Sequence, residues 1–180
     1  MTEQMSVKIA ALPSLRLTVE AHGLMAKKAL GQNFLLDQNI TDKIINLSLQ
    51  KQNKKDFSGA NVFEVGPGPG GLTRAVLAAE PKSLTVVEMD ERCIAIMNEI
   101  KEKTGDILHI INGDAMQTDF SVLAPAPRHI VSNLPYNISV PLLVGWLKNI
   151  NAYDSLTLMF QKEVAERITA PIKTLSLIHI

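Results

Sequence analysis

A glycine-dense stretch preceded by a carboxylate is the strongest chemical signal in the sequence. Residues 61–73 read Asn-Val-Phe-Glu-Val-Gly-Pro-Gly-Pro-Gly-Gly-Leu-Thr, an apolar run followed by glycines and then by helix-forming residues. This order is typical of a buried strand, a tight turn and a helix that begins near Gly71. Glycines let the backbone approach a ligand closely, and the open N–H groups of a helix start can bind it. We therefore predict a nucleotide-like ligand at Gly66.

Glu64 helps to distinguish between the possible ligands. The glycine spacing differs from the dinucleotide fingerprint, and a carboxylate just before Gly66 would repel a pyrophosphate. A ligand that carries an amine or a positive charge would be attracted instead, which favours S-adenosylmethionine as the cofactor. A dinucleotide and a purely structural turn remain alternatives for this motif taken alone.

Two further carboxylates follow the next two predicted strands. Glu88 ends the strand expected at residues 84–88 and lies 22 residues after Gly66. A carboxylate at that place can accept hydrogen bonds from both ribose hydroxyls of an adenosine, although a surface residue at a strand end is an equal alternative. After the strand expected at residues 107–111, Asp114 can accept a hydrogen bond from the adenine amino group, and Met116 can cover the ring.

The run Asn133-Leu134-Pro135-Tyr136 suits the activation of an aromatic amine. Such an amine is a poor nucleophile because its lone pair is delocalised into the ring. The Asn133 side-chain oxygen and the Leu134 carbonyl could each accept one N–H, while Tyr136 stacks on the base. Pro135 keeps Leu134 in an extended conformation. Four residues are a short signal, and an ordinary turn is the alternative.

The elements that position these residues alternate between strand and helix. Strands are expected at residues 61–65, 84–88, 107–111, 129–132 and 155–160, and helices at residues 15–22, 38–49, 71–80, 91–103, 138–147 and from 161. This alternation predicts a doubly wound α/β fold with strand order 3-2-1-4-5. Asp37 is expected to cap the helix at residues 38–49, with Ile40, Ile44, Ile45 and Leu47 on its apolar face. Residues 1–12 are expected to form a loosely held terminus.

Composition limits the cell compartment and the metal chemistry. With 180 residues, 46% hydrophobic and 20% charged, the chain suits one globular domain. The sequence shows neither a membrane span nor a secretory signal, so we expect a cytoplasmic protein without a membrane partner. One cysteine, Cys93, and four scattered histidines predict no disulfide framework and no metal site.

Basic residues are in slight excess in the first 60 residues, where eight Lys or Arg oppose five Asp or Glu. This excess permits a nucleic-acid partner that contacts Lys27, Lys28, Lys51, Lys54 and Lys55. Solvated surface lysines are the alternative.

Six motifs together closely resemble the KsgA family of ribosomal RNA adenine N6-dimethyltransferases. They are Gly-Gln-Asn-Phe-Leu at 31–35, Glu-Val-Gly-Pro-Gly at 64–68, Val-Glu-Met-Asp at 87–90, Gly-Asp-Ala-Met at 113–116, Asn-Leu-Pro-Tyr-Asn-Ile-Ser at 133–139 and Gln-Lys-Glu-Val-Ala at 161–165. The resemblance covers about residues 12–170. It implies a Rossmann-like class I methyltransferase domain that uses S-adenosyl-L-methionine. It also implies dimethylation of two adjacent adenosines in small-subunit ribosomal RNA during ribosome biogenesis.

The resemblance also implies roles for individual residues. Cofactor binding is implied for Asn33, Leu35, Gly66, Glu88, Asp114 and Asn133. The target adenine is implied to be held by Asn133, Leu134, Pro135 and Tyr136. We expect the full-length protein to bind the small ribosomal subunit as a monomer and to need no metal.

The end of the chain departs from the family pattern. Family members continue with further strands, a clamping aromatic residue and a small helical C-terminal domain. We therefore expect an N-terminal helical segment and linker at residues 1–60, an incomplete S-adenosylmethionine-binding core at residues 61–170, and a non-native tail at residues 171–180 that resembles a translated sequencing adapter. A chain of this kind is expected to be inactive on ribosomal RNA.

Two other functions share much of this pattern. A large-subunit ribosomal RNA methyltransferase of the macrolide-resistance type has most of these motifs, although the versions at residues 31–35 and 161–165 favour the small-subunit family. A non-catalytic RNA-binding assembly factor on the same scaffold is the second alternative. The intact Asn133-to-Tyr136 run argues against it.

Overall fold

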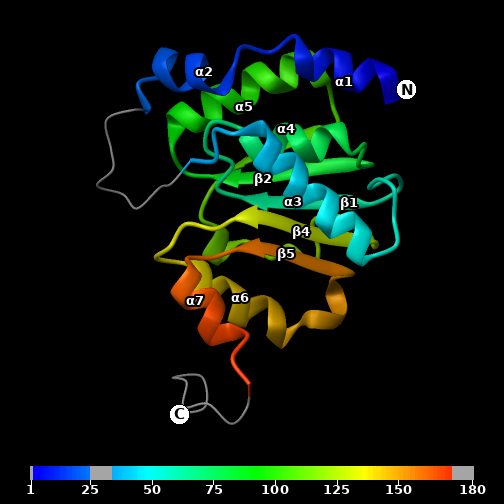
Figure 1. Ribbon diagram of the computed structural model, residues 1–180, viewed down its shortest axis with the longest axis vertical. Helices are drawn as coiled ribbons and strands as arrows, with labels where there is room; N and C mark the ends of the chain where they lie inside the picture. Colours follow the sequence, from blue (N-terminus) through cyan, green and yellow to red (C-terminus); the bar gives the residue numbers. More distant parts are fainter. Residues whose placement is uncertain (1, 25–33, 172–180) are drawn as a thin grey trace.

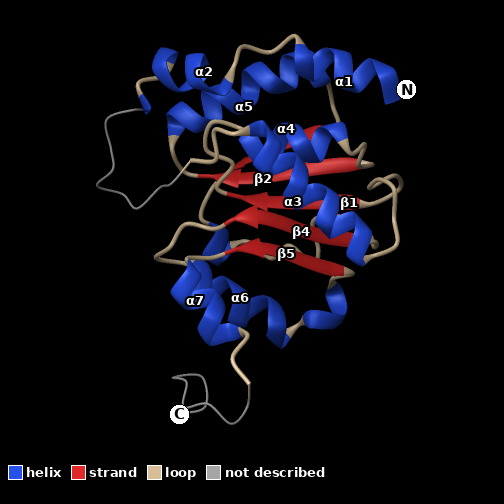
Figure 2. Cartoon of the chain, viewed as in Figure 1, coloured by secondary structure: helices blue, strands red, loops and turns tan. Residues whose placement is uncertain are grey.

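The fold is built on a five-stranded parallel sheet. In the computed structural model, which describes residues 2–24 and 34–171, the strands are β1 (Asn61–Val65), β2 (Ser83–Glu88), β3 (Leu108–Asn112), β4 (Arg128–Asn133) and β5 (Ser155–Met159). Their order is β3-β2-β1-β4-β5, which confirms the predicted α/β class and strand order. All strand arrows point the same way in Figure 2, so the carboxyl ends of the strands share one edge.

Helices cover both faces of this sheet. They are α1 (Thr2–Ala10), α2 (Leu15–Ala21), α3 (Gln38–Lys51), α4 (Gly71–Ala78), α5 (Glu91–Thr104), α6 (Ser139–Lys148) and α7 (Lys162–Ile168), together with the short 3-10 helices η3 (Ala115–Gln117) and η4 (Ile150–Ala152). Figure 1 shows α1, α2 and α5 at one end of the molecule and α6 and α7 at the other, beyond β5. The chain therefore winds away from β1 in both directions, as a doubly wound fold requires.

The sheet separates two hydrophobic cores. Successive strand residues point to opposite faces, so Val62 packs with α3, α4 and α5, whereas Phe63 packs with η3 and α6. On the second face, Phe63, Phe120 and Trp146 make edge-to-face ring contacts at centroid distances of 5.7 and 5.8 Å. Every residue of β1 is buried, because a central parallel strand is covered on both faces.

One expectation about packing is wrong, and a second is correct only in part. The expected loose terminus contains α1, which packs on α4 and α5, and Ile9 contacts the first core. Asp37 caps α3 as expected, and Ile44 and Ile45 pack in the first core. However, Ile40 and Leu47 of this helix are 47% and 48% exposed. The buried face of α3 instead includes Ser48, whose hydroxyl lies 2.7 Å from the Thr157 hydroxyl of β5. Polar contacts thus replace part of the expected apolar face.

Some predictions fall on residues outside the described ranges. These are Asn33, Lys27 and Lys28, together with the expected non-native tail apart from Pro171. Within residues 2–24 and 34–171, no helix combines the length and hydrophobicity that a membrane span needs.

Candidate functional site

The glycine turn after β1 is enclosed by segments from distant parts of the chain. A Cβ added at Gly71 would lie 2.3 Å from the Leu35 carbonyl oxygen, and one added at Gly66 would lie 3.2 Å from the Pro135 ring. Gly66 also has a φ of +65°, where glycine is favoured over other residues. The segment before α3 and the segment after β4 therefore both lie against the glycine turn.

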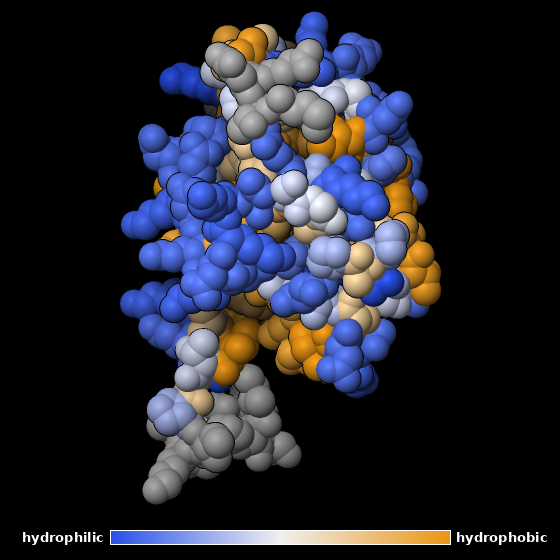
Figure 3. Space-filling model, turned by 90° about the vertical axis from the view of Figure 1, so that its right-hand side faces the viewer, coloured by the Kyte–Doolittle hydropathy of each residue, from blue (hydrophilic) through white to orange (hydrophobic). Residues whose placement is uncertain are grey.

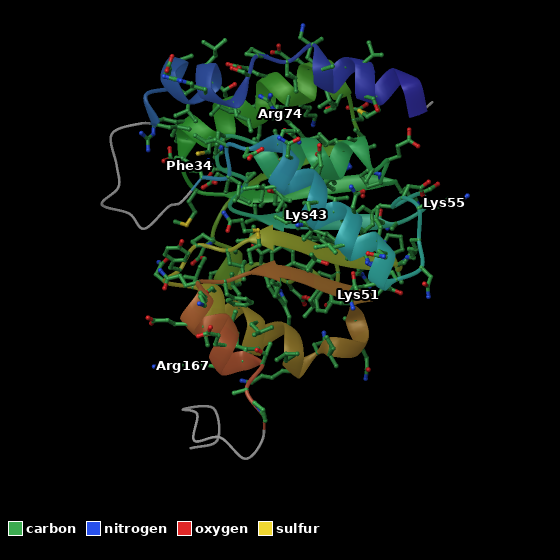
Figure 4. The ribbon with its side chains drawn as sticks, viewed as in Figure 1. Phe34, Lys43, Lys51, Lys55, Arg74 and Arg167 are labelled. Atoms are coloured by element: carbon green, nitrogen blue, oxygen red, sulfur yellow. The ribbon has the colours of Figure 1, made fainter. Side chains whose placement is uncertain are left out.

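A small pocket lies at this turn. Three of the predicted cofactor-binding residues line it, Leu35, Gly66 and Asn133, together with Phe34 and Glu64. In Figure 4, Phe34 lies on the side of the molecule toward which the strands point. The structure thus brings together residues that are 98 positions apart in the chain, from Leu35 to Asn133.

Glu64 is buried beneath the turn. Its exposed fraction is 1%, and one carboxyl oxygen accepts a hydrogen bond from the Thr73 hydroxyl at 2.7 Å. Burial raises the pKa of Glu64 to about 8, although the Thr73 hydrogen bond lowers it, and the nearby Glu88 raises it further. The carboxyl group is therefore mainly protonated at neutral pH. A cation placed beside it would favour loss of that proton.

Glu88 ends β2 with its carboxylate held in a fixed orientation. Glu88 Oε1 accepts hydrogen bonds from the backbone N–H groups of Met89 and Asp90 at 2.8 and 3.0 Å. The strand register pairs Glu88 with Asn112 of β3, so the loop that carries Asp114 begins directly beside it. One oxygen of Glu88 is thus fixed by the local backbone, which orients the other.

Asp114 caps η3 in a similar way. Asp114 Oδ1 accepts a hydrogen bond from the Met116 N–H at 2.8 Å, and its carbonyl oxygen accepts one from the Thr118 hydroxyl at 2.9 Å. The Met116 side chain is 42% exposed. The loop therefore presents a carboxylate and an exposed apolar side chain together.

Strands β1 and β4 separate near their carboxyl ends, where the strand order reverses. Their paired register ends at Phe63 and Ile130. Beyond it, Ser132 Oγ donates to the Val65 carbonyl oxygen at 2.7 Å and accepts from the Val65 N–H at 3.3 Å. A crevice at such a reversal is the usual ligand position in open parallel sheets. Sequence reasoning missed Ser132, although a lone hydroxyl in a buried apolar strand was a usable signal.

The segment after β4 is a turn fixed at several points. Leu134 is buried in the second core, and the Pro135 ring lies against the glycine turn. The Pro135 carbonyl accepts the Ile138 N–H at 3.2 Å, and the Tyr136 carbonyl accepts the Ser139 hydroxyl at 3.1 Å. The predicted run at residues 133–136 is therefore held between β4 and α6, next to the pocket at Gly66.

Arg92 makes a contact between distant segments that the sequence did not indicate. Its Nη2 lies 2.5 Å from Asp90 Oδ2, and its Nη1 donates to the Gly23 carbonyl oxygen at 3.2 Å. Arg92 thus links the loop that follows Glu88 to the end of α2. Among the described residues, no group of His, Cys, Asp or Glu side chains is arranged to hold a metal ion.

The described lysines of the expected RNA-binding set lie away from this pocket. Figure 4 places Lys51 and Lys55 on the side of the molecule opposite Phe34, and Arg167 of α7 on the same side as Phe34. Figure 3 looks onto the side that carries Lys51 and Lys55, where hydrophilic side chains gather on the left half of the view and hydrophobic ones along the right edge. Lys54 contacts His129, with 3.2 Å between Lys54 Nζ and His129 Nε2. Among the described residues, Lys51 and Lys55 of the expected set therefore do not border the pocket.

Comparison with known proteins identifies the family. A model described as "Ribosomal RNA adenine dimethylase" matches residues 23–178. The chain belongs to this ribosomal RNA adenine dimethylase family. The ribosomal RNA small subunit methyltransferase A of Gluconobacter oxydans is 51% identical to this chain over 160 residues. The match covers 89% of this chain and 51% of that protein. The chain thus spans about half the length of the curated relatives it matches.

Solved structures agree with the family assignment. A dimethyladenosine transferase from Plasmodium falciparum has a TM-score of 0.65 and 32% identity, and the similarity covers 78% of this chain and 47% of that one. The 23S rRNA methyltransferase ErmE has a TM-score of 0.60 and 25% identity, and the similarity covers 76% of this chain and 51% of that one. Both similarities support the Rossmann-like methyltransferase fold.

Proposed function

We propose that this protein is an S-adenosylmethionine-dependent methyltransferase that dimethylates the N6 amines of two adjacent adenosines in small-subunit ribosomal RNA. The observation that carries the proposal is that Asn133 and Gly66 line one pocket at the strand-order reversal. A group that can orient an amine thus lies beside a turn that can hold a methyl donor. Membership of the ribosomal RNA adenine dimethylase family supports the same reaction.

Five positions are proposed to bind the donor besides Asn133. The Glu88 carboxylate would accept hydrogen bonds from the ribose hydroxyls through its outward oxygen, since Oε1 is held by backbone N–H groups. Asp114 would accept from the adenine amino group. The backbone at Leu35 and Gly66 would contact the methionine part, and Asn33 is assigned to the donor by the family motif.

The acceptor amine is proposed to be prepared by the run at residues 133–136. The bound donor supplies an electrophilic methyl group on its sulfonium. The Asn133 side-chain oxygen and the Leu134 carbonyl would accept the two N–H groups of the adenine amine, which directs the nitrogen lone pair out of the ring plane toward the donor. Tyr136 would stack on the flipped base, and Pro135 keeps the run against the glycine turn. The nitrogen that has received a methyl group then loses one proton to solvent, so one N–H remains and one acceptor suffices for the second transfer.

A specific comparison favours the small-subunit substrate over the macrolide-resistance type. The Gluconobacter oxydans relative, named for the small subunit, is 51% identical, whereas the 23S rRNA methyltransferase ErmE is 25% identical. The position of Arg167 on the same side as Phe34 offers one cation for RNA phosphates there.

The test is methyl transfer by the full-length protein to small subunits that lack the modification, with the products counted by mass spectrometry. Asn133→Ala should lower turnover at saturating RNA, whereas Tyr136→Ala should also weaken the apparent RNA affinity, because stacking is worth about 1–3 kcal/mol per base. Asn46→Ala, on the exposed face of α3, is the matched control. Parental rates in both variants would show that the proposed amine site is wrong. Methylation of large-subunit RNA alone would favour the macrolide-resistance type, and no transfer with retained RNA binding would favour the assembly factor.

A further inference from the structure

A second and larger cavity lies between η3 and α6. Its volume is about 330 Å³, which is within the usual range of small-ligand pockets. Leu142 and Trp146 of α6, which belong to the second core, form part of its apolar wall. Met116 also lines it, so the cavity adjoins the loop that is proposed to bind the adenine of the donor.

Gly145 keeps this cavity open. It lies inside α6 and lines the cavity, and a Cβ added there would meet no atom within 4 Å. Glycine within a helix is unfavourable relative to alanine because it loses more conformational freedom on folding. Any larger side chain at this position would extend into the space that glycine leaves empty.

Polar groups at the cavity are available for a ligand. Within the described part of the chain, the side-chain amides of Gln117 and Asn149 and the Tyr153 hydroxyl form no hydrogen bond. Asp119 Oδ1 accepts hydrogen bonds from the Ser121 N–H and hydroxyl at 2.9 and 2.6 Å. These bonds lower the pKa of Asp119, so its carboxylate is ionised and its Oδ2 can accept from a ligand.

The chemistry of this lining suits a nucleobase better than a phosphate. No Lys, Arg or His is among the lining residues. Arg128 lies close enough to act on Asp119 and Tyr153, but the lining itself carries a carboxylate, which repels an anion. Side-chain amides recognise the edges of bases, and a carboxylate accepts a hydrogen bond from an exocyclic amino group. Sequence-specific RNA recognition commonly uses such pockets for bases that are unpaired and unstacked.

We propose that this cavity binds an unpaired nucleobase with an exocyclic amino group, from a position of the RNA substrate other than the target adenosine. The identity of the ligand class rests on the proposed function. Because Met116 borders both the cavity and the proposed adenine site, a base held there would fix the RNA close to the reaction centre.

Trp146 provides a direct readout of the cavity, since it is the only tryptophan in the chain. Its fluorescence can be followed while cytidine or uridine is added to the chain, with N-acetyltryptophanamide as the control for light absorbed by the nucleoside. Cytidine and uridine are similar in size, but only cytidine carries an exocyclic amine. We expect a saturable fluorescence change with cytidine and at least about tenfold weaker binding of uridine. A site that accepts a hydrogen bond from the amine of its ligand rejects an analogue that lacks this amine.

Three variants test whether the cytidine response comes from the cavity or from the fold as a whole. Gly145→Leu should abolish the cytidine response, whereas Val144→Leu, on the neighbouring exposed position of α6, should leave it unchanged. Asp119→Asn keeps an oxygen for the Ser121 hydrogen bonds but should remove most of the preference for cytidine over uridine. Circular dichroism that is unchanged in Gly145→Leu would show that the variant folds.

Several outcomes would overturn the proposal. One is equal binding of cytidine and uridine, and another is the lack of any saturable response. Tighter binding of N-acetylarginine amide than of cytidine would indicate a basic protein partner instead. Because free nucleosides are the probes, the result does not depend on methyl transfer. Cytidine binding without methyl transfer would count against the proposed function alone.

Discussion

The Thr73 hydroxyl donates a 2.7 Å hydrogen bond to the buried Glu64 carboxyl group across the glycine turn. Burial raises the pKa of Glu64 to about 8, while the Thr73 bond acts in the opposite direction. Burial, the Thr73 hydrogen bond and the nearby Glu88 therefore together set the pH at which a negative charge forms beneath the proposed donor site.

The first prediction is that donor binding releases a proton from Glu64 at neutral pH. A positively charged donor would lower the pKa of Glu64 from about 8, so affinity should rise as pH increases toward that value. Calorimetry in two buffers of different ionisation enthalpy measures the released protons. Glu64→Gln should remove the protons that the protein releases on donor binding. Protons released by the donor's own amino group would be the same for both proteins. Equal proton release in the parent and Glu64→Gln would contradict the assignment.

The second prediction concerns stability at alkaline pH. The folded-state pKa of Glu64 is about 8 against an ordinary value of 4.5. Its contribution to stability is therefore fully present below 4.5 and is lost as pH rises through about 8. Between pH values of about 5 and 9, the melting temperature of the parent should fall more than that of Glu64→Gln. Parallel melting curves across this window would count against the raised pKa.

The third prediction concerns the acid side and His129. The ring is buried, with 3.2 Å between its Nε2 and Lys54 Nζ and 2.7 Å between its Nδ1 and Ser155 Oγ. Burial and, to a lesser degree, Lys54 lower its pKa below 6.5, and Asp154 opposes them. Stability from neutral His129 is therefore present above about 6.5 and lost as pH falls below that value.

Urea unfolding at several pH values tests the His129 prediction. The parent should lose more unfolding free energy than His129→Gln when pH falls from about 7 to 5. Lys54→Met removes a positive charge beside the ring, so it should reduce the loss. A steeper loss in Lys54→Met would show that the sign is wrong.

The fourth prediction separates the charge of Glu88 from its local hydrogen bonds. Glu88→Gln keeps an oxygen for the Met89 and Asp90 N–H groups but loses the charged acceptor for ribose, whereas Glu88→Ala loses both. Hydrogen bonds to charged groups are worth about 1.5–3 kcal/mol, so both variants should weaken donor binding, and alanine more. Calorimetry with the donor and filter binding with RNA would show which ligand is affected. Unchanged donor affinity in both variants would remove Glu88 from the site.

The fifth prediction compares two glycines under the same substitution. Gly71→Ala places a Cβ 2.3 Å from the Leu35 carbonyl oxygen, whereas Gly145→Ala meets no atom within 4 Å. The first should destabilise the fold by about 1–3 kcal/mol because it overpacks a closed contact. The second should be neutral or stabilising by about 0.5–1 kcal/mol, as expected for a helix interior. Chemical denaturation of both proteins gives the comparison, and equal destabilisation would show that the Leu35 contact is not rigid.

Local spacing determined the elements and their order. The apolar run at β1, the glycines after it and Asp37 ahead of α3 each act on neighbours a few residues away, so the sequence alone indicated a strand, a turn and a capped helix. Parallel strands joined by helices then bring their carboxyl ends to one edge, which is why Glu88, Asp114 and Asn133 were predicted to lie near one ligand.

Tertiary structure decided what long-range contacts control. The apolar pattern of α3 could not show that Ile40 lies exposed, because that depends on which neighbouring elements cover the helix. The raised pKa of Glu64 comes from complete burial by distant segments, and the Ser132 bond to Val65 exists only because β4 lies next to β1. The cavity beside Gly145 likewise requires η3 and α6 to be placed together. These properties depend on residues far apart in the chain, so their physical basis appears only when the sheet is assembled.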